Sequence, residues 1–241
     1  MMRTYTIDDC EYISVTSVLD TINKGDILLD WASTQACNYL ADNLGNTNLT
    51  FPELLDQASK NYLSVKNEAC DIGSEVHFLI EQNIKGIWVD IRVLRPEVRN
   101  GFLAYLSWKR KFNVKFIHSE LQVVSKRFSY EGTLDAIVSI NGKLILVDWK
   151  TSGALYETFP LQVCAYQEAA REMKIHTDGV AVVRFDKYTG AFEFQDYTKG
   201  REKHLHSWLK LLDFFYAYKQ RRLRNNPRAS GAEFKAARMV A

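Results

Sequence analysis

Cysteine is scarce in this chain of 241 residues, and the four that occur are widely scattered. Cys10, Cys37, Cys70 and Cys164 form no CxxC pair. Zinc sites and iron–sulfur clusters need cysteines at close, regular spacing, so the sequence predicts neither. We expect reduced thiols that mainly fill space in the core.

Long apolar runs and targeting segments are also absent from the sequence. The longest runs, such as "LILV" and "VAVV", are far too short to span a bilayer. The first residues, "MMRTYTIDDCEY", lack a basic start before an apolar stretch and are too acidic for a transit peptide. We therefore expect no signal peptide, no membrane partner and a cytoplasmic location in a bacterial or infected host cell.

Charge is nearly balanced over the chain but unevenly distributed along it. The formal net charge is +2, yet residues 201–241 alone carry +7, which leaves about −5 for the rest. Arg221, Arg222 and Arg224 lie in the densest basic stretch, "YKQRRLRNNPR". Such a segment predicts an anionic partner, of which nucleic acid is the obvious candidate. The alternative is a solvated helix face followed by a disordered tail.

The N-terminal half of the chain shows helical periodicity. A short strand or turn at "SVTSVLD" leads into expected helices at residues 30–43, 52–83 and 96–112. We expect a break in the second of these helices near Gly73. Pro96 suits the first turn of the third helix.

The pattern then changes to strands. We expect strands at residues 114–125, 128–140 and 143–152, a helix at 159–173, a hairpin over 178–197 and a last helix at 199–222. "NG" at Asn141-Gly142 is a strong signal for a tight turn between the second and third strands.

These elements predict an α/β fold with a central mixed β-sheet flanked by helices, plus an N-terminal helical addition. The content of 46% hydrophobic and 25% charged residues is that of an ordinary globular protein. We expect a helical region at residues 1–113, a core at 114–222 and a basic tail at 223–241.

Acidic residues interrupt two otherwise apolar strands at Asp135 and Asp148, and Lys150 follows two residues after the second. Since strand side chains alternate between faces, Asp148 and Lys150 project from the same face. Counting outward from the "NG" turn places Asp135 opposite Asp148. Two carboxylates so close together are unfavourable unless a cation lies between them.

Oxygen ligands that leave room for water suit Mg²⁺ or Mn²⁺. The pattern therefore predicts a metal site at the edge of the sheet, where Lys150 would orient a water molecule. The alternative is a buried ion pair between Asp148 and Lys150, with Asp135 exposed to solvent.

The stretches "GTLDAI", "LILVDWKTS" and "LQVCAYQEA" occur in this order along the chain. The arrangement resembles the PD-(D/E)xK nuclease superfamily and, within it, the RecB-like exonucleases, which include phage exonucleases and the mitochondrial genome maintenance exonuclease. D-x-K alone is a weak motif, but between G-x-x-D and Q-x-x-x-Y it is a strong one. The resemblance covers most of residues 14–185 and implies a restriction-endonuclease-like core for the α/β fold.

The resemblance implies a role for each matching residue. Asp135, Asp148 and Lys150 match the catalytic positions, and Glu120 in "HSELQVV" matches a further catalytic acid. The implied metal ligands are Asp135, Asp148, Glu120, His77 of "GSEVHFLIE" and the carbonyl oxygen of Trp149.

The implied DNA contacts are Gln162, Tyr166, Thr151 and Ser152, together with the arginines of the basic segment. Gln162 and Tyr166 are four residues apart and share one helix face. Several of the implied site residues could instead have purely structural roles. Tyr166 could be a core residue, His77 a core or surface residue and Glu120 a surface residue, while Thr151 and Ser152 could cap the strand.

Some RecB-like relatives carry an iron–sulfur cluster whose last cysteines follow the Q-x-x-x-Y helix. No cysteine follows Cys164 here, so the resemblance implies the branch without a cluster. It implies a Mg²⁺- or Mn²⁺-dependent deoxyribonuclease, an exonuclease that favours single-stranded DNA ends in replication, recombination or repair. DNA and other proteins of these processes are the implied partners. The rivals are a DNA-binding accessory protein without catalysis and a structure-specific endonuclease such as a junction resolvase.

Overall fold

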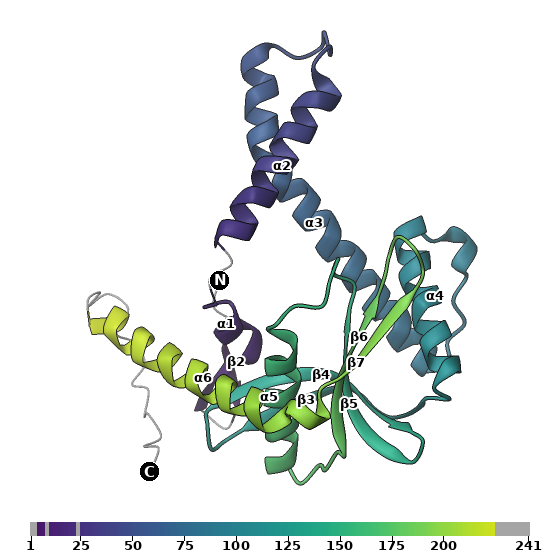
Figure 1. Ribbon diagram of the computed structural model, residues 1–241, viewed down its shortest axis with the longest axis vertical. Coiled ribbons are helices and arrows are strands. Elements are labelled where there is room, and N and C mark those ends of the chain that lie inside the picture. The colour runs from purple at the N-terminus through teal and green to yellow at the C-terminus, as the bar shows by residue number, and fades with distance from the viewer. Residues whose placement is uncertain (1–3, 8–9, 23–24, 225–241) are drawn as a thin grey trace.

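A computed structural model of the chain describes residues 4–7, 10–22 and 25–224 (Figure 1). Its centre is one mixed sheet of seven strands in the order β1-β2-β4-β5-β6-β7, with β3 paired to β4. The strands are β1 (Thr4–Ile7), β2 (Cys10–Ser14), β3 (Lys115–Ser125), β4 (Tyr130–Ile140), β5 (Lys143–Lys150), β6 (Gly179–Phe185) and β7 (Phe192–Asp196).

The hairpin of β4 and β5 forms at the predicted turn. Asn141 and Gly142 both have positive φ angles, 52° and 81°, as a two-residue hairpin turn requires. The antiparallel ladder then runs from Ile140 opposite Lys143 to Ala136 opposite Val147. The register that we obtained by counting from the turn is therefore confirmed over these residues.

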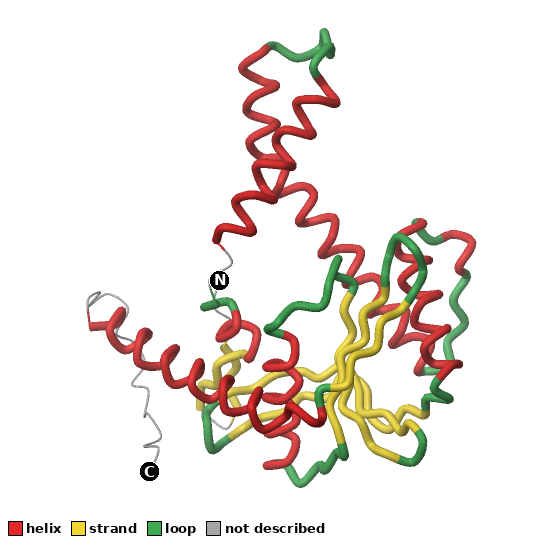
Figure 2. Tube along the Cα trace, in the orientation of Figure 1, coloured by secondary structure: helices red, strands yellow, loops and turns green. Residues whose placement is uncertain are grey.

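Helices cover both faces of the sheet (Figure 2). They are α1 (Val15–Leu19), α2 (Gly25–Asn43), α3 (Phe51–Ile84), α4 (Pro96–Lys111), α5 (Phe159–Glu172) and α6 (Arg201–Arg224), with short 3-10 turns at Ile91–Val93 and Thr198–Gly200. One core lies between the sheet and α1, α5 and α6, and the other between the sheet and α3 and α4. The alternation along β5 follows this division, because Leu146 enters the first core while Val147 and Trp149 enter the second.

Helix α3 is a single uninterrupted helix of 34 residues, about 51 Å long. Its N-terminus carries a capping box between Thr50 and Glu53, and its first half pairs with α2 in a hairpin that projects from the sheet (Figure 1). The expected break near Gly73 is wrong. A Cβ atom on Gly73 would lie 3.0 Å from Oγ1 of Thr151, so the glycine allows close approach of the chain after β5 rather than ending the helix.

The predicted α/β architecture is confirmed: a mixed sheet is flanked by helices, an N-terminal helical part is added, and the arrangement is consistent with a restriction-endonuclease-like core. The β1–β2 hairpin was not predicted. Ile13 of β2 pairs with Tyr130 of β4 and is buried in the first core. The division of the chain at residues 113 and 222 stays a prediction. Among the described residues, no helix is long and apolar enough to cross a membrane.

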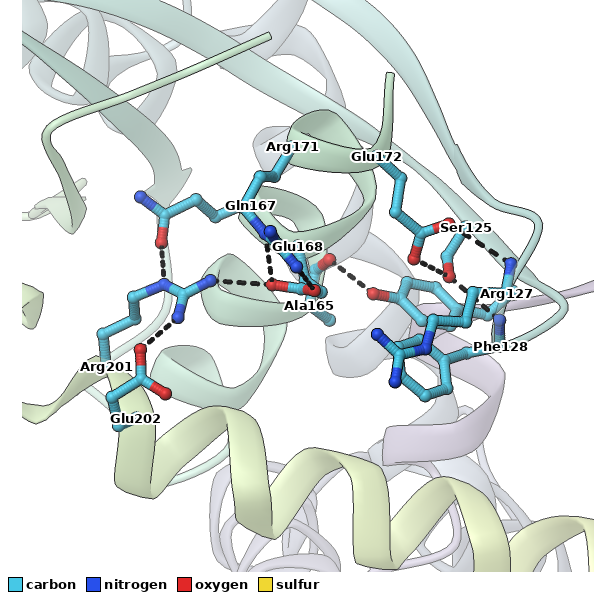
Figure 3. Close-up of polar contacts among 11 residues, drawn as sticks. Ser125, Arg127, Phe128, Ala165, Gln167, Glu168, Arg171, Glu172, Arg201 and Glu202 are labelled. Atoms are coloured by element: carbon cyan, nitrogen blue, oxygen red, sulfur yellow. Dashed lines mark hydrogen bonds and ion pairs between the residues drawn. The ribbon is translucent and has the colours of Figure 1, made fainter. Parts of the chain in front are cut away.

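A buried carboxylate joins α5 to the start of α6 (Figure 3). Glu168 is only 5% exposed and accepts hydrogen bonds from Arg171 at 2.5 Å and Arg201 at 2.8 Å. Gln167 also accepts a hydrogen bond from Arg201, at 2.6 Å. Burial raises the pKa of Glu168, but the two guanidinium groups outweigh it and hold the pKa below its usual value.

We predict that Arg201→Ala lowers the free energy of unfolding by about 2 kcal/mol at pH 7, because it removes one of the two arginines that donate hydrogen bonds to a buried carboxylate. A depressed pKa in the folded state stabilises the protein above the ordinary pKa of glutamate, and this contribution is lost as the pH falls. The difference between variant and wild type should therefore shrink between pH 5 and pH 3 in urea titrations. Lys203→Ala, an exposed change on the same helix, is the control. A deficit that stays constant with pH would contradict this role of Glu168.

Candidate active site

Three carboxylates occupy one row across three neighbouring strands. Ala136 is the last residue of β4 that pairs with β5, opposite Val147, so the next residues in register are Asp135 and Asp148. On the other side of β4, Ser119 faces Ala136 and Leu121 faces Leu134, which places Glu120 opposite Asp135. The backbone of Glu120 has a positive φ of 49°, an uncommon conformation that interrupts the regular strand at this position.

The row lies inside the sheet, so the predicted placement at the sheet edge is wrong. Strand β6 follows α5 and adds to β5 in parallel, with Val182 beside Asp148 and Arg184 beside Lys150. The site instead lies where β5 separates from β4. There the Trp149 amide donates a hydrogen bond of 2.7 Å to the side-chain Oδ2 atom of Asp135.

Asp148 and Lys150 form the centre of a buried polar network with α5. Nζ of Lys150 lies 2.7 Å from Oδ2 of Asp148 and donates to Oε1 of Gln162 at 3.1 Å. The Gln162 amide in turn donates to Oδ1 of Asp148 and to the Tyr166 hydroxyl, both at 3.0 Å. The ion pair that we considered as an alternative is thus present, but Asp135 is only 9% exposed rather than solvated.

Asp148 is enclosed by the fold and is ion-paired. Its Oδ2 atom lies 2.7 Å from the Lys150 ammonium. Burial raises the pKa of Asp148 to about 6, against the opposing charge of Lys150. The raised pKa indicates that Lys150 does not fully offset the burial of this carboxylate, so a further positive ion would stabilise its charged form.

His77 reaches the same row from helix α3. Its Nδ1 atom lies 3.5 Å from Oδ1 of Asp135. Burial lowers the pKa of His77, but the charge and hydrogen bond of Asp135 outweigh it and raise the pKa overall. Close packing of α3 brings it here: a Cβ on Gly101 of α4 would lie 2.9 Å from the Val76 side chain, one residue before His77.

His77, Glu120 and Asp135 each offer a ligand atom within 4.8 Å of the other two. Burial, and then the charge of Asp135, raise the pKa of Glu120. One imidazole nitrogen and two carboxylates are donors that divalent ions such as Mn²⁺ and Mg²⁺ accept. The residues present therefore fit a divalent metal ion. Asp148 is not part of this three-residue cluster, so its ligation of the same ion remains a prediction.

Gln162 and Tyr166 are buried rather than displayed to solvent, at 7% and 3% exposure. Their contact with DNA stays a prediction, while the hydrogen bonds above hold Asp148 and Lys150 in place. Sequence reasoning missed a further requirement at Gly132, where a Cβ would lie 2.3 Å from the Tyr166 ring. The glycine of G-x-x-D thus makes room for the tyrosine of Q-x-x-x-Y, a link that neither motif reveals by itself.

The remaining predicted contacts lie apart from this network. The Ser152 hydroxyl donates to the Ala154 carbonyl, and the Ser152 carbonyl accepts from Arg184 at 3.4 Å. Thr151 lies against Gly73 of α3. The backbones of Arg221, Arg222 and Arg224 are helical within α6, but their side chains lie outside the described residues, as do residues 225–241 of the predicted tail.

Comparison with known proteins gives limited likenesses. The chain matches no protein-family model and no curated sequence. Among solved structures it is similar to a protein of Eubacterium rectale named "putative exonuclease", with a TM-score of 0.45 and 14% identity over 70% of this chain and 76% of that one. It is also similar to a protein named SSO0001, with a TM-score of 0.30 and 17% identity over 59% of this chain and 70% of that one. Both TM-scores are below about 0.5, so we base function on the site itself.

We predict that Gly132→Ala destabilises the protein by about 1–3 kcal/mol, because the added methyl group overlaps the buried Tyr166 ring. Displacement of the ring should also weaken the Gln162–Tyr166 hydrogen bond. Gly153→Ala is the matched control, since a Cβ there meets no atom within 4 Å. Denaturant unfolding of both variants measures the difference, and equal stabilities would refute the proposed packing requirement.

Proposed function

We propose that this protein is a metal-dependent deoxyribonuclease, an exonuclease that hydrolyses phosphodiester bonds and favours single-stranded DNA ends in replication, recombination or repair. The observation that carries the proposal is the carboxylate row of Glu120, Asp135 and Asp148 with Lys150 beside it. The intact motif order that resembles RecB-like exonucleases supports the same reaction.

Asp135, Asp148, Glu120 and His77 would hold one or two Mg²⁺ or Mn²⁺ ions, with the Trp149 carbonyl as a further ligand. Such an ion supplies positive charge to the phosphate group and favours ionisation of the attacking water. The negative charge of the carboxylate row would otherwise repel a phosphodiester, so the reaction depends on this neutralisation.

Lys150 would orient the attacking water, because its ammonium carries three donors and is positioned by Asp148 and Gln162. The Lys150 ammonium lies 4.9 Å from the centre of the Phe159 ring, which further restricts its movement. Gln162 and Tyr166 would act through these two residues, by holding the carboxylate and ammonium in one geometry.

The two rival functions make different demands on the site. A DNA-binding accessory protein without catalysis has no need for a buried Asp148 in contact with Lys150, and this costly arrangement favours an enzyme. A junction resolvase would need two copies related by symmetry. Its products from branched DNA would distinguish it from an exonuclease.

We predict that Lys150→Met reduces Mg²⁺- or Mn²⁺-dependent cleavage by at least about 100-fold, in line with removal of one group that stabilises the transition state. Asp148→Asn should do the same. Lys143→Met is the control and should retain activity, because Lys143 is exposed and lies at the opposite end of β5 from Lys150. Release of label from end-labelled single-stranded DNA measures the rates, with EDTA as the metal-free control. Full activity of a folded Lys150→Met protein would remove this assignment.

We predict a second difference between linear and circular substrates. An exonuclease needs a free end, so linear single-stranded DNA should be degraded while a covalently closed single-stranded circle of the same sequence survives. Gel analysis over time measures both. Rapid nicking of the circle would instead favour the endonuclease, and cleavage of RNA in preference to DNA would correct the substrate.

A further inference from the structure

The turn between β6 and β7 displays an aromatic ring to solvent on an unusually well-fixed backbone. Tyr188 is 70% exposed. Oδ1 of Asp186 accepts hydrogen bonds of 2.9 Å from the amides of Tyr188 and Thr189. Gly190 closes the turn with a positive φ of 72°. The backbone of the turn is therefore fixed, while the Tyr188 ring stays in solvent and contributes little hydrophobic burial to the fold.

Helix α4 fixes the same turn from its side. Asn100 Nδ2 donates to the carbonyl oxygen of Lys187 at 3.2 Å and to that of Tyr188 at 2.9 Å. Figure 1 shows the β6–β7 turn beside α4. Because Asn100 binds the carbonyls of both Lys187 and Tyr188, the backbone that carries the Tyr188 ring is already ordered. Binding of a ligand to the ring would therefore cost little further backbone entropy.

Lys187 adds a positive charge next to this ring. The residue is only 9% exposed, and its ammonium lies 5.5 Å from the centre of the Tyr188 ring. Within the described residues no carboxylate forms an ion pair with it. The ammonium is thus a cation that an anion from outside could neutralise.

The turn lies at the same end of the sheet as the candidate active site. β5 and β6 are parallel, with Lys150 beside Arg184, and Arg184 also donates to the Ser152 carbonyl. Tyr188 is four residues beyond Arg184, so their Cα atoms are at most about 14 Å apart. Figure 1 shows the loop after β5 and the β6–β7 turn leaving the sheet on the same side.

We propose that the β6–β7 turn binds one nucleotide of a single strand, with the base stacked on Tyr188 and a backbone phosphate paired with Lys187. This inference rests on the proposed nuclease function. It describes how the protein would hold the DNA strand away from the bond that is cleaved. An exposed ring accepts any unpaired base, whereas a base inside a duplex is already stacked on its neighbours. The turn would therefore favour single strands without reading their sequence.

Binding of fluorescently labelled oligothymidine by the full-length protein in EDTA tests the proposal without cleavage. Tyr188→Ala should raise the dissociation constant about 5- to 150-fold, the range for loss of one stacked base. Tyr188→Phe should bind like wild type, because it keeps the ring. Phe51→Ala is the matched control, since Phe51 is 69% exposed and is the first residue of α3, at the other end of that helix from His77.

Two further measurements separate the base from the phosphate. Tyr188→Ala should not alter affinity for an abasic sugar-phosphate strand of the same length, whereas Lys187→Met should weaken it. Lys187→Met should also reduce the slope of log K against log salt by about 0.7, which Tyr188→Ala should leave unchanged.

Equal affinity of Tyr188→Ala and wild type for oligothymidine would overturn this inference and leave the nuclease proposal in place. A wild-type protein that neither binds the strand nor cleaves DNA with Mg²⁺ or Mn²⁺ would remove both.

Discussion

The row of three carboxylates across β3, β4 and β5 is the constraint on which the rest of the site depends. Glu120 lies opposite Asp135, Asp148 directly follows the last residue of β5 that pairs with β4, and Asp135 and Asp148 are largely withdrawn from solvent. Like charges in such a place repel each other and lose hydration, so the fold must supply positive charge or proton donors. Lys150, the Trp149 amide and His77 meet part of this demand. The raised pKa of Asp148 shows that part of the cost of its burial remains.

The surrounding elements can be understood as supports for this row. Helix α5 provides Gln162 and Tyr166 on one face, and Gly132 leaves the space that Tyr166 needs. Helix α3 crosses close enough to deliver His77 because Gly73 has no side chain to meet Thr151. These two glycines allow the helices to approach closely the strands that carry the three carboxylates. Damage to this packing would therefore disturb the chemistry without touching a reacting group.

Part of the site could be predicted from the sequence because it depends on one hairpin, whose register follows from residues that are close together in the chain. The turn at Asn141-Gly142 fixed the counting that placed Asp135 opposite Asp148, and strand alternation put Lys150 beside Asp148. Other features depend on contacts between distant segments. β3 pairs regularly with β4 from Ser125 to His118, but no two-residue turn signal joins these strands, so counting alone could not place Glu120. Nor could the strand pattern show that β6 would pair with β5 on the side away from β4. The site was therefore wrongly assigned to an edge of the sheet.

Crystallographic localisation of Mn²⁺ by anomalous scattering tests the central claim most directly, because it does not depend on knowing the substrate. The account predicts an ion within about 2.4 Å of carboxylate oxygens from both Asp135 and Asp148, with Lys150 displaced from Oδ2 of Asp148. Lys150→Met should leave this ion in place, since the lysine is not a ligand. A well-occupied Mn²⁺ site elsewhere, with the Asp148–Lys150 contact unchanged, would contradict the account.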